Sequence, residues 1–398
     1  MTTDVLIVGG GIGGAALALA LGRRGWSVRV FEREEAPPSV VRPEILQQST
    51  IDALERLGAD ARLHAEAALP LHRLQLHMGR ECILSVDERD LAAADSQPLS
   101  TDPVLTRTLI IDAALATGNV ELVTNAEVTT VVRDGERIVG VRGRREGHAF
   151  EARARLLVGD DGARSIIRGC LGIRTRLRLF PVEFITFSVP CPASYPPHTA
   201  RGWIRSEAMR DGLFAGFVLP LPDDRLAGLL LASIGVWERR FEGRPDAFWR
   251  DVEALTPLAG SLQGNLHFPD DFERRRRAYG HASRYVDDGA AILGDAAHPM
   301  SPAAGQSANA SIWDALALAD VADEALRADD LSASRLAAFE RRRRPANRRS
   351  LRFSRRAVAL LRLDRWFPGS AAATIRTLLR RSGQKRRLLH MAATAFRE

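Results

Sequence analysis

Cysteine is scarce in this chain: three residues, Cys82, Cys170 and Cys191, occur in 398 positions. They are far apart and form no C-x-x-C pair, which argues against a disulfide framework, a thiol redox centre and a zinc site. We therefore predict that the protein binds no metal and works in a reducing compartment.

Long apolar segments are also missing. No run of about 18 apolar residues is present, so no membrane-spanning helix is expected. The first residues carry no basic segment and lead straight into an apolar strand pattern, unlike a signal peptide. Both observations predict a cytoplasmic protein.

Lysine is nearly absent, since Lys385 is the only one, and the net charge of +7 depends on arginine. Residues 335–398 hold 19 lysines and arginines against 3 acidic residues, which leaves the preceding chain at −9. The body is acidic and the tail is basic. No nucleic-acid recognition motif accompanies this charge, so no nucleic-acid partner is expected.

The strongest pattern lies at the N-terminus. Residues 5–8 form an apolar run typical of a buried parallel strand, and Gly9, Gly11 and Gly14 follow with G-x-G-x-x-G spacing. Gly9 permits a sharp turn, Gly11 lets the backbone approach a diphosphate, and Gly14 lets a helix pack closely on the strand.

The residues after this loop complete the pattern. Residues 15–21 predict a small-residue helix, and residues 28–31 predict a second strand that ends on Glu32. Glu32 lies 18 residues after Gly14, where a carboxylate can accept the hydroxyls of an adenosine ribose. The pattern predicts a dinucleotide site and leaves NAD and FAD as alternatives.

Two later strands each deliver a conspicuous loop. Residues 156–158 lead into Asp161-Gly162-x-x-Ser165-x-x-Arg168, and residues 289–293 lead into Gly294-Asp295-Ala-Ala-His298 and a long helix from about 306 to 326. Strand patterns at 184–189, 213–219 and 226–234 predict an antiparallel sheet between the two loops. We also expect a hairpin over 71–87, a loop over 92–103 and a helix over 107–116 that begins at Arg107.

Together, the three motifs resemble the single-component FAD-dependent monooxygenases of the aromatic-hydroxylase type, with a p-hydroxybenzoate hydroxylase-like fold. The resemblance covers about residues 4–345. It predicts an α/β protein with a Rossmann-like FAD-binding domain, an inserted, mainly antiparallel β-sheet substrate domain and a C-terminal helical tail. The expected domains are the FAD-binding domain (1–70, 101–180 and 281–345), the substrate domain (71–100 and 181–280) and the basic amphipathic tail (346–398).

The resemblance also implies roles for single residues. Glu32 would hold the adenosine ribose, Arg107 the pyrophosphate and Asp295 the ribityl chain, while Pro302 and Gly305 would lie beside the reactive edge of the flavin. The full set of expected cofactor-binding residues is Gly9, Gly11, Gly14, Glu32, Arg33, Arg42, Arg107, Asp161, Gly162, Gly294, Asp295, Gln306, Ser307 and Asn309. Two positions depart from the family pattern, because Asp160 replaces an alanine and Ser307 replaces a glycine.

The activity implied by the resemblance is hydroxylation of an aromatic or polycyclic small molecule. NADH or NADPH would reduce the FAD transiently, and O2 would react to give a flavin C4a-hydroperoxide in a dry cavity. Olefin epoxidation of a lipophilic substrate and capture of a partner enzyme's intermediate without oxygenation remain alternatives. Halogenation is disfavoured, since flavin halogenases need a lysine on the flavin domain and Lys385 lies in the tail.

Other features support weaker hypotheses. Arg205, Phe214 and Phe217 are candidate substrate contacts in the inserted sheet, although solvated arginine and core packing are the simpler interpretations. His298 is expected to be structural. The amphipathic tail is expected to pack on the acidic body, with peripheral membrane attachment as the alternative. We expect a monomer or a homodimer.

Overall fold

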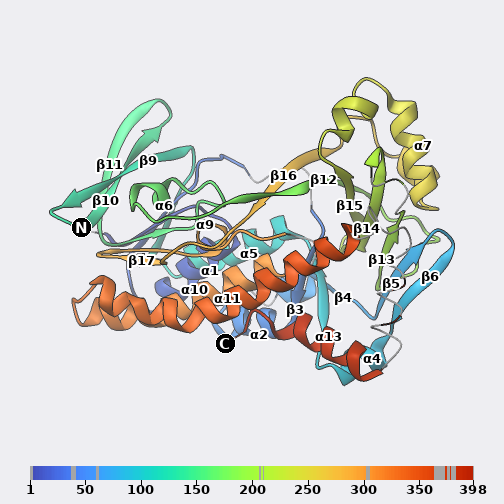
Figure 1. Ribbon diagram of the computed structural model, residues 1–398. Coiled ribbons are helices and arrows are strands. Elements are labelled where there is room, and N and C mark those ends of the chain that lie inside the picture. Colours follow the sequence, from blue (N-terminus) through green and yellow to red (C-terminus); the bar gives the residue numbers. More distant parts are fainter. Residues whose placement is uncertain are drawn as a thin grey trace.

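A computed structural model describes residues 3–36, 42–59, 62–205, 208, 210–301, 305–362, 373, 377 and 382–397. The chain forms two large sheets, and helices α10 and α11 run along one side of the molecule (Figure 1). The predicted α/β fold class is confirmed.

The first sheet has eight strands, with β17, β18, β11, β1, β2 and β8 side by side and a β9–β10 ribbon attached to β11. The pairs β2–β8, β1–β2, β1–β11 and β11–β18 are parallel. Their apolar residues are buried, as expected for a parallel sheet covered by helices. The bounds are β1 (Thr3–Val8), β2 (Val28–Phe31), β8 (Val120–Val123), β9 (Ala126–Asp134), β10 (Arg137–Arg145), β11 (His148–Gly159), β17 (Val286–Asp287) and β18 (Ala290–Ile292).

The second sheet has seven strands in the order β16, β12, β15, β14, β13, β5 and β6. All pairs are antiparallel except β13–β5. The expected hairpin over 71–87 is present as β5 and β6. The bounds are β5 (Arg73–Met78), β6 (Glu81–Val86), β12 (Arg178–Pro190), β13 (Thr199–Ile204), β14 (Leu213–Pro220), β15 (Arg225–Ser233) and β16 (Glu273–Tyr279).

A small third sheet joins the two. It pairs β3 (Glu44–Gln47) and β4 (Ala68–Pro70) with β7 (Pro98–Thr101), all antiparallel. The expected loop over 92–103 is therefore wrong in part, because β7 lies within it. Pairing with residues 29 to 57 positions away along the chain stabilises this strand, and the local sequence carries little sign of it.

Helices pack on both of the large sheets. The expected helix at 107–116 begins four residues earlier, because Asp102 caps it: its Oδ1 accepts from the N–H groups of Val104 (2.8 Å) and Leu105 (3.1 Å), with Pro103 at the first helical position. The bounds are α1 (Ile12–Gly22), α2 (Gln48–Arg56), α3 (Arg62–Ala65), α4 (Glu88–Ala93), α5 (Pro103–Leu115), α6 (Ile166–Cys170), the π-helical turn Trp237–Phe241, α7 (Pro245–Leu255), α8 (Ala259–Gln263), α9 (Gly294–Ala297), α10 (Ser307–Arg327), α11 (Ala333–Arg362) and α13 (Ser382–Thr394).

The end of the tail packs on the body. Helix α13 lies beside α4, and Lys385 contacts Asp90 (Figure 1). Phe396 is fully buried beside Met300, and its carbonyl accepts from Arg343 at 2.7 Å. The packing hypothesis is confirmed for residues 382–397, whereas the amphipathic stretch at 371–379 lies mostly outside the described residues. Within the described chain, no helix is long and apolar enough to cross a membrane.

Candidate active site

The glycine loop between β1 and α1 forms one wall of the site. Gly9 has φ +105°, and a Cβ there would collide with the carbonyl oxygen of Asp160. A Cβ on Gly14 would likewise collide with the carbonyl oxygen of Gly9. Both positions therefore require glycine. The N-terminus of α1 lines the cavity at Gly11, Ile12 and Gly13.

Glu32 and Arg107 hold this loop from two sides. Glu32 accepts from the N–H of Gly10 at 2.9 Å through Oε2, and Arg107 donates to the carbonyl of Gly10. The structure thus brings Glu32 and Arg107 to the dinucleotide loop, as expected. Arg33 is exposed and pairs with Glu34 at 2.8 Å.

The second motif is tied to the loop of the third motif. Asp161 accepts from the N–H groups of Ile166 (2.7 Å) and Ile167 (3.1 Å) and so caps α6. Buried Arg168 donates to the carbonyls of Ala163 (2.8 Å) and Ala296 (2.7 Å). The motif therefore fixes the positions of loops that lie far apart in sequence. The other oxygen of Asp161, Oδ1, is buried and has no hydrogen-bond partner among the residues that the structure describes.

Asp160, which departs from the family pattern, lies at the N-terminus of α1. Its Oδ2 accepts from the N–H of Gly14 at 2.6 Å, so it caps the helix from a distant segment. Burial raises the pKa of Asp160 well above its usual range, the Gly14 N–H opposes this, and nearby Asp295, Asp161 and Asp314 raise it further. This carboxyl lines the cavity, although sequence reasoning did not include it among the site residues.

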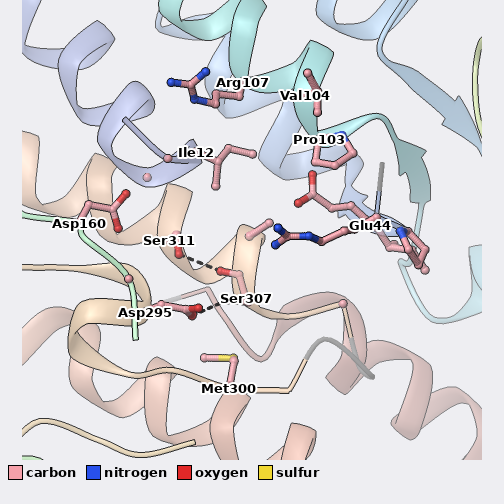
Figure 2. A pocket seen from close by; sticks show the side chains of 18 of the residues that line it. Ile12, Glu44, Pro103, Val104, Arg107, Asp160, Asp295, Met300, Ser307 and Ser311 are labelled. Atoms are coloured by element: carbon pink, nitrogen blue, oxygen red, sulfur yellow. Dashed lines mark hydrogen bonds between the residues drawn. The ribbon is translucent and has the colours of Figure 1, made fainter. Parts of the chain in front are cut away.

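The third motif places Asp295 and Ser307 against each other. The Ser307 hydroxyl donates to Asp295 Oδ1 at 2.8 Å, and Ser311 donates to the Ser307 carbonyl at 3.0 Å (Figure 2). The second departure, serine for glycine at position 307, thus supplies a hydrogen bond that orients Asp295 beside the cavity. Gly294 adopts φ +57°, and a Cβ there would come close to Asp160 and Ser311.

Behind this loop lies a buried polar cluster. His298 is 1% exposed, and its Nε2 lies 2.5 Å from Asp314 Oδ2. Arg343 donates to Asp314 Oδ1 at 2.8 Å. Burial would raise the pKa of Asp314, but His298 and Arg343 hold it well below its usual range. The expected structural role of His298 agrees with this geometry.

Two expected cofactor residues face protein partners instead of the cavity. Asn309 is buried and bonds Gln47, Thr50, Ile45 and Gly305, so it ties α10 to β3 and α2. Gln306, also buried, donates to the carbonyl of Ala392 at 2.8 Å. Pro302 lies outside the described residues, whereas Gly305 borders the cavity with φ +61°.

These elements surround a cavity of about 370 Å³ (Figure 2). Its walls come from the glycine loop, β3, the start of α5 and the start of α10. Sequence reasoning missed several of its residues, because pairing between distant segments brings them there. The lining residues are Gly11, Ile12, Gly13, Arg42, Pro43, Glu44, Ile45, Pro103, Val104, Arg107, Asp160, Gly162, Arg277, Asp295, Met300, Gly305, Ser307, Ala308 and Ser311.

Glu44 is the most perturbed acid on the β3 side of this cavity. Its Oε1 accepts from the Thr101 hydroxyl at 3.0 Å, and it lies beside Pro103 (Figure 2). Burial raises the pKa of Glu44 to about 7, Thr101 opposes this, Asp102 adds to it and Arg42 opposes it. A carboxyl that titrates near neutral pH is a recognised feature of functional sites.

A smaller cavity of about 30 Å³ adjoins the first on the side of the second sheet. Arg42, Pro43 and Arg277 border both cavities. The remaining walls are Phe184, Thr186, Leu229, Glu273 and Arg275. The second sheet therefore reaches the first cavity through Arg277 of β16.

The expected substrate contacts do not border either cavity. Arg205 lies 3.7 Å from Asp251 of α7, on the far face of the sheet. Phe214 belongs to the buried apolar cluster that contains Phe184 and Leu229, and partly buried Phe217 packs against it. They support the cavity wall from within the sheet core.

The lining of the cavity matches the shape and chemistry of FAD. A Cβ would collide with backbone at Gly9 and Gly14, and the N-terminus of α1 lines the cavity at Gly11, Ile12 and Gly13, where backbone N–H groups can donate to a ligand. Arg107 offers positive charge there, and Asp295 offers acceptors farther along. These features suit an extended molecule with a diphosphate at one end and a polyhydroxy chain in the middle, which is the shape of FAD.

Residues 2–354 match the family described as "FAD binding domain". The chain belongs to this family. It is 28% identical over 351 residues to 6-methylpretetramide 4-monooxygenase of Streptomyces rimosus, covering 88% of this chain and 82% of that protein. It is 30% identical over 388 residues to ubiquinone hydroxylase UbiL of Rhodospirillum rubrum, covering 86% and 78%.

A solved structure agrees with the sequence comparisons. PqsL of Pseudomonas aeruginosa, in complex with 2-aminobenzoylacetate, superposes with a TM-score of 0.79 at 25% identity and covers 93% of this chain and 99% of that one. The predictions of family, fold class and FAD as cofactor are confirmed. This chain is a flavoprotein monooxygenase, and NADH or NADPH is the electron donor typical of its family.

Proposed function

We propose that this flavoprotein hydroxylates a polycyclic or quinone-like aromatic molecule that carries a hydroxyl or keto oxygen. The observation that carries the proposal is the junction of the two cavities, where the nucleotide site meets Phe184 and Leu229 of the inserted sheet. The named relatives act on a pretetramide and on ubiquinone-type rings, which supports this substrate class.

We assign the cofactor contacts as follows. The N–H groups at Gly11 to Gly13 and the Arg107 guanidinium hold the diphosphate, and Glu32 accepts from the adenosine ribose. Asp295, oriented by Ser307, accepts from the ribityl hydroxyls. Bound FAD supplies the reducing electrons and the oxygen chemistry of the reaction.

The chain's own residues shape the reacting end. Gly305 has no side chain, so the backbone before α10 can approach a flat ring closely. The N-terminus of α10 places its positive end there. Phe184, Leu229 and Met300 exclude water, which preserves an oxidant that water would destroy.

The test is turnover under ¹⁸O₂ with flavin-loaded protein, NADH or NADPH, and a panel of polycyclic phenols, quinols and quinolones. The expected product of one class is heavier by one ¹⁸O atom, and nicotinamide oxidation accelerates when that substrate is added. If neither NADH nor NADPH reduces the flavin in the presence of any compound of the panel, the capture of an intermediate without oxygenation is favoured instead. Addition of the label across an isolated double bond would favour epoxidation.

A further inference from the structure

Strand β16 carries four consecutive arginines, and three of them have acidic partners. Arg274 pairs with Glu238 at 3.2 Å, Arg275 pairs with Glu273, and Arg276 pairs with Glu183 at 2.9 Å. These pairs neutralise most of the charge on the strand.

Arg277 is different. No hydrogen bond or ion pair joins it to any residue in the described part of the chain, and its Nε is buried without a partner. Burial lowers the pKa of Arg277, as do the neighbouring cations Arg42 and Arg275, while Asp295 opposes the shift. A partly buried guanidinium without a partner is costly, and the cost is relieved when an anion enters.

Its position shows where such an anion would come from. Arg277 borders both cavities, at the point where the nucleotide site meets the sheet. Arg42 also borders both, but its Nε already bonds Glu273 at 3.1 Å. Arg107, which touches the glycine loop, serves the other end of the nucleotide cavity. Arg277 is therefore the guanidinium available to a ligand at this junction.

We propose that Arg277 is an anion-recognition residue that pairs with an acidic oxygen of a ligand entering between the two cavities. The shared chemistry is an oxyanion that accepts two parallel N–H bonds from the guanidinium. Its source is an aromatic substrate with a carboxylate, phenolate or enolate oxygen, or the diphosphate of the nicotinamide donor. The substrate alternative extends the proposed function, whereas binding of the diphosphate does not depend on ring hydroxylation.

Binding to flavin-loaded protein separates the two sources without turnover. The probes are 3-hydroxy-2-naphthoate, its uncharged methyl ester, and ADP-ribose as a redox-inert diphosphate. Titration calorimetry would be run on the natural chain, Arg277→Met, Arg277→Lys and the control Arg178→Met, which alters an exposed arginine on neighbouring β12. Flavin content and thermal stability of each variant are recorded in parallel.

If the substrate is the source, the naphthoate binds the natural chain at least about tenfold more tightly than its ester does. Arg277→Met then removes this difference, and Arg277→Lys restores part of it, because a point charge remains without the planar fork. If the donor is the source, Arg277→Met weakens ADP-ribose about tenfold and leaves the naphthoate unchanged. Arg178→Met changes neither.

Two results would overturn the proposal. One is equal binding of both anions by the natural chain and Arg277→Met. The other is failure of the natural chain to bind either anion. If Arg277→Met does not fold, the comparison of the natural chain with Arg277→Lys decides, since an unchanged affinity for both anions would then exclude bidentate recognition. The two proposals can fail separately. If no anion binds but ¹⁸O is still incorporated, only the role of Arg277 is wrong. If the anion binds but no ¹⁸O is incorporated, only the proposed hydroxylation is wrong.

Discussion

Replacing Glu44 by glutamine tests the electrostatics of the cavity most directly. In the native protein the pKa of Glu44 is raised from 4.5 to about 7, chiefly by burial. The unfolded chain therefore releases this proton at lower pH than the folded chain does, so the native state loses stability as the pH rises from about 4.5 to 7. Glu44→Gln removes this loss while keeping an oxygen that can accept from Thr101.

The size of the effect follows from the shift. Between pH 5 and pH 8, a carboxyl with these two pKa values costs the native state about 2–3 kcal/mol. The stability of Glu44→Gln relative to the natural chain should therefore rise by up to this amount over the same range. Urea unfolding of flavin-loaded protein at pH 5, 6, 7 and 8, followed by far-ultraviolet circular dichroism, measures it.

Glu273 provides a matched control on the wall of the adjoining cavity. Burial alone would raise its pKa, but Arg275 and Arg42 lower it below the usual value. Its stabilising contribution is lost only as the pH falls into the acidic range, so Glu273→Gln should be destabilised by a constant amount from pH 6 to pH 8. A stability difference between Glu44→Gln and the natural chain that stays flat from pH 5 to pH 8 would refute the reasoning.

Three further predictions concern other parts of the site. Gly14→Ala should weaken FAD binding by about 1–3 kcal/mol, because the added methyl group collides with the glycine loop; the flavin absorbance retained after gel filtration measures this, and full retention would contradict it. Asp314→Asn should lower the free energy of unfolding by about 3–5 kcal/mol, since it leaves buried Arg343 without its carboxylate, and a loss below about 1 kcal/mol would argue against a charged cluster. Phe396→Ala should lower the free energy of unfolding by about 3 kcal/mol. It should also raise the KM for the aromatic substrate, because Phe396 packs beside Met300 at the cavity. Leu388→Ala, on the exposed side of α13, should change neither quantity.

The sequence predicted the strand–loop–helix unit around Gly9 and Gly14 well, because local geometry imposes these residues. Gly9 and Gly14 are required by contacts within one strand–loop–helix unit, and Asp295 follows a buried strand at once. The start of α5 at Pro103 could also have been predicted, because Asp102 followed by Pro103 is a recognisable helix start.

The substrate side could not be predicted in the same way. Glu44 reaches the cavity because β3 pairs with β7, more than fifty residues away. Arg277 is less exposed than Arg274, Arg275 and Arg276 and lacks an acidic partner among the described residues, whereas their partners come from β12, from the π-helical turn and from β16 itself. A run of four arginines gives no sign of which one remains uncompensated, so sequence reasoning chose Arg205, whose neighbour Asp251 lies on α7.

The carboxyl of Asp160 gives the first turn of α1 a permanent hydrogen-bond partner. The first turn of α1 already has an acceptor supplied by the chain, so the apoprotein does not leave that end of the helix bare. Burial raises the pKa of this carboxyl well above its usual range, so negative charge is disfavoured at this part of the cavity wall.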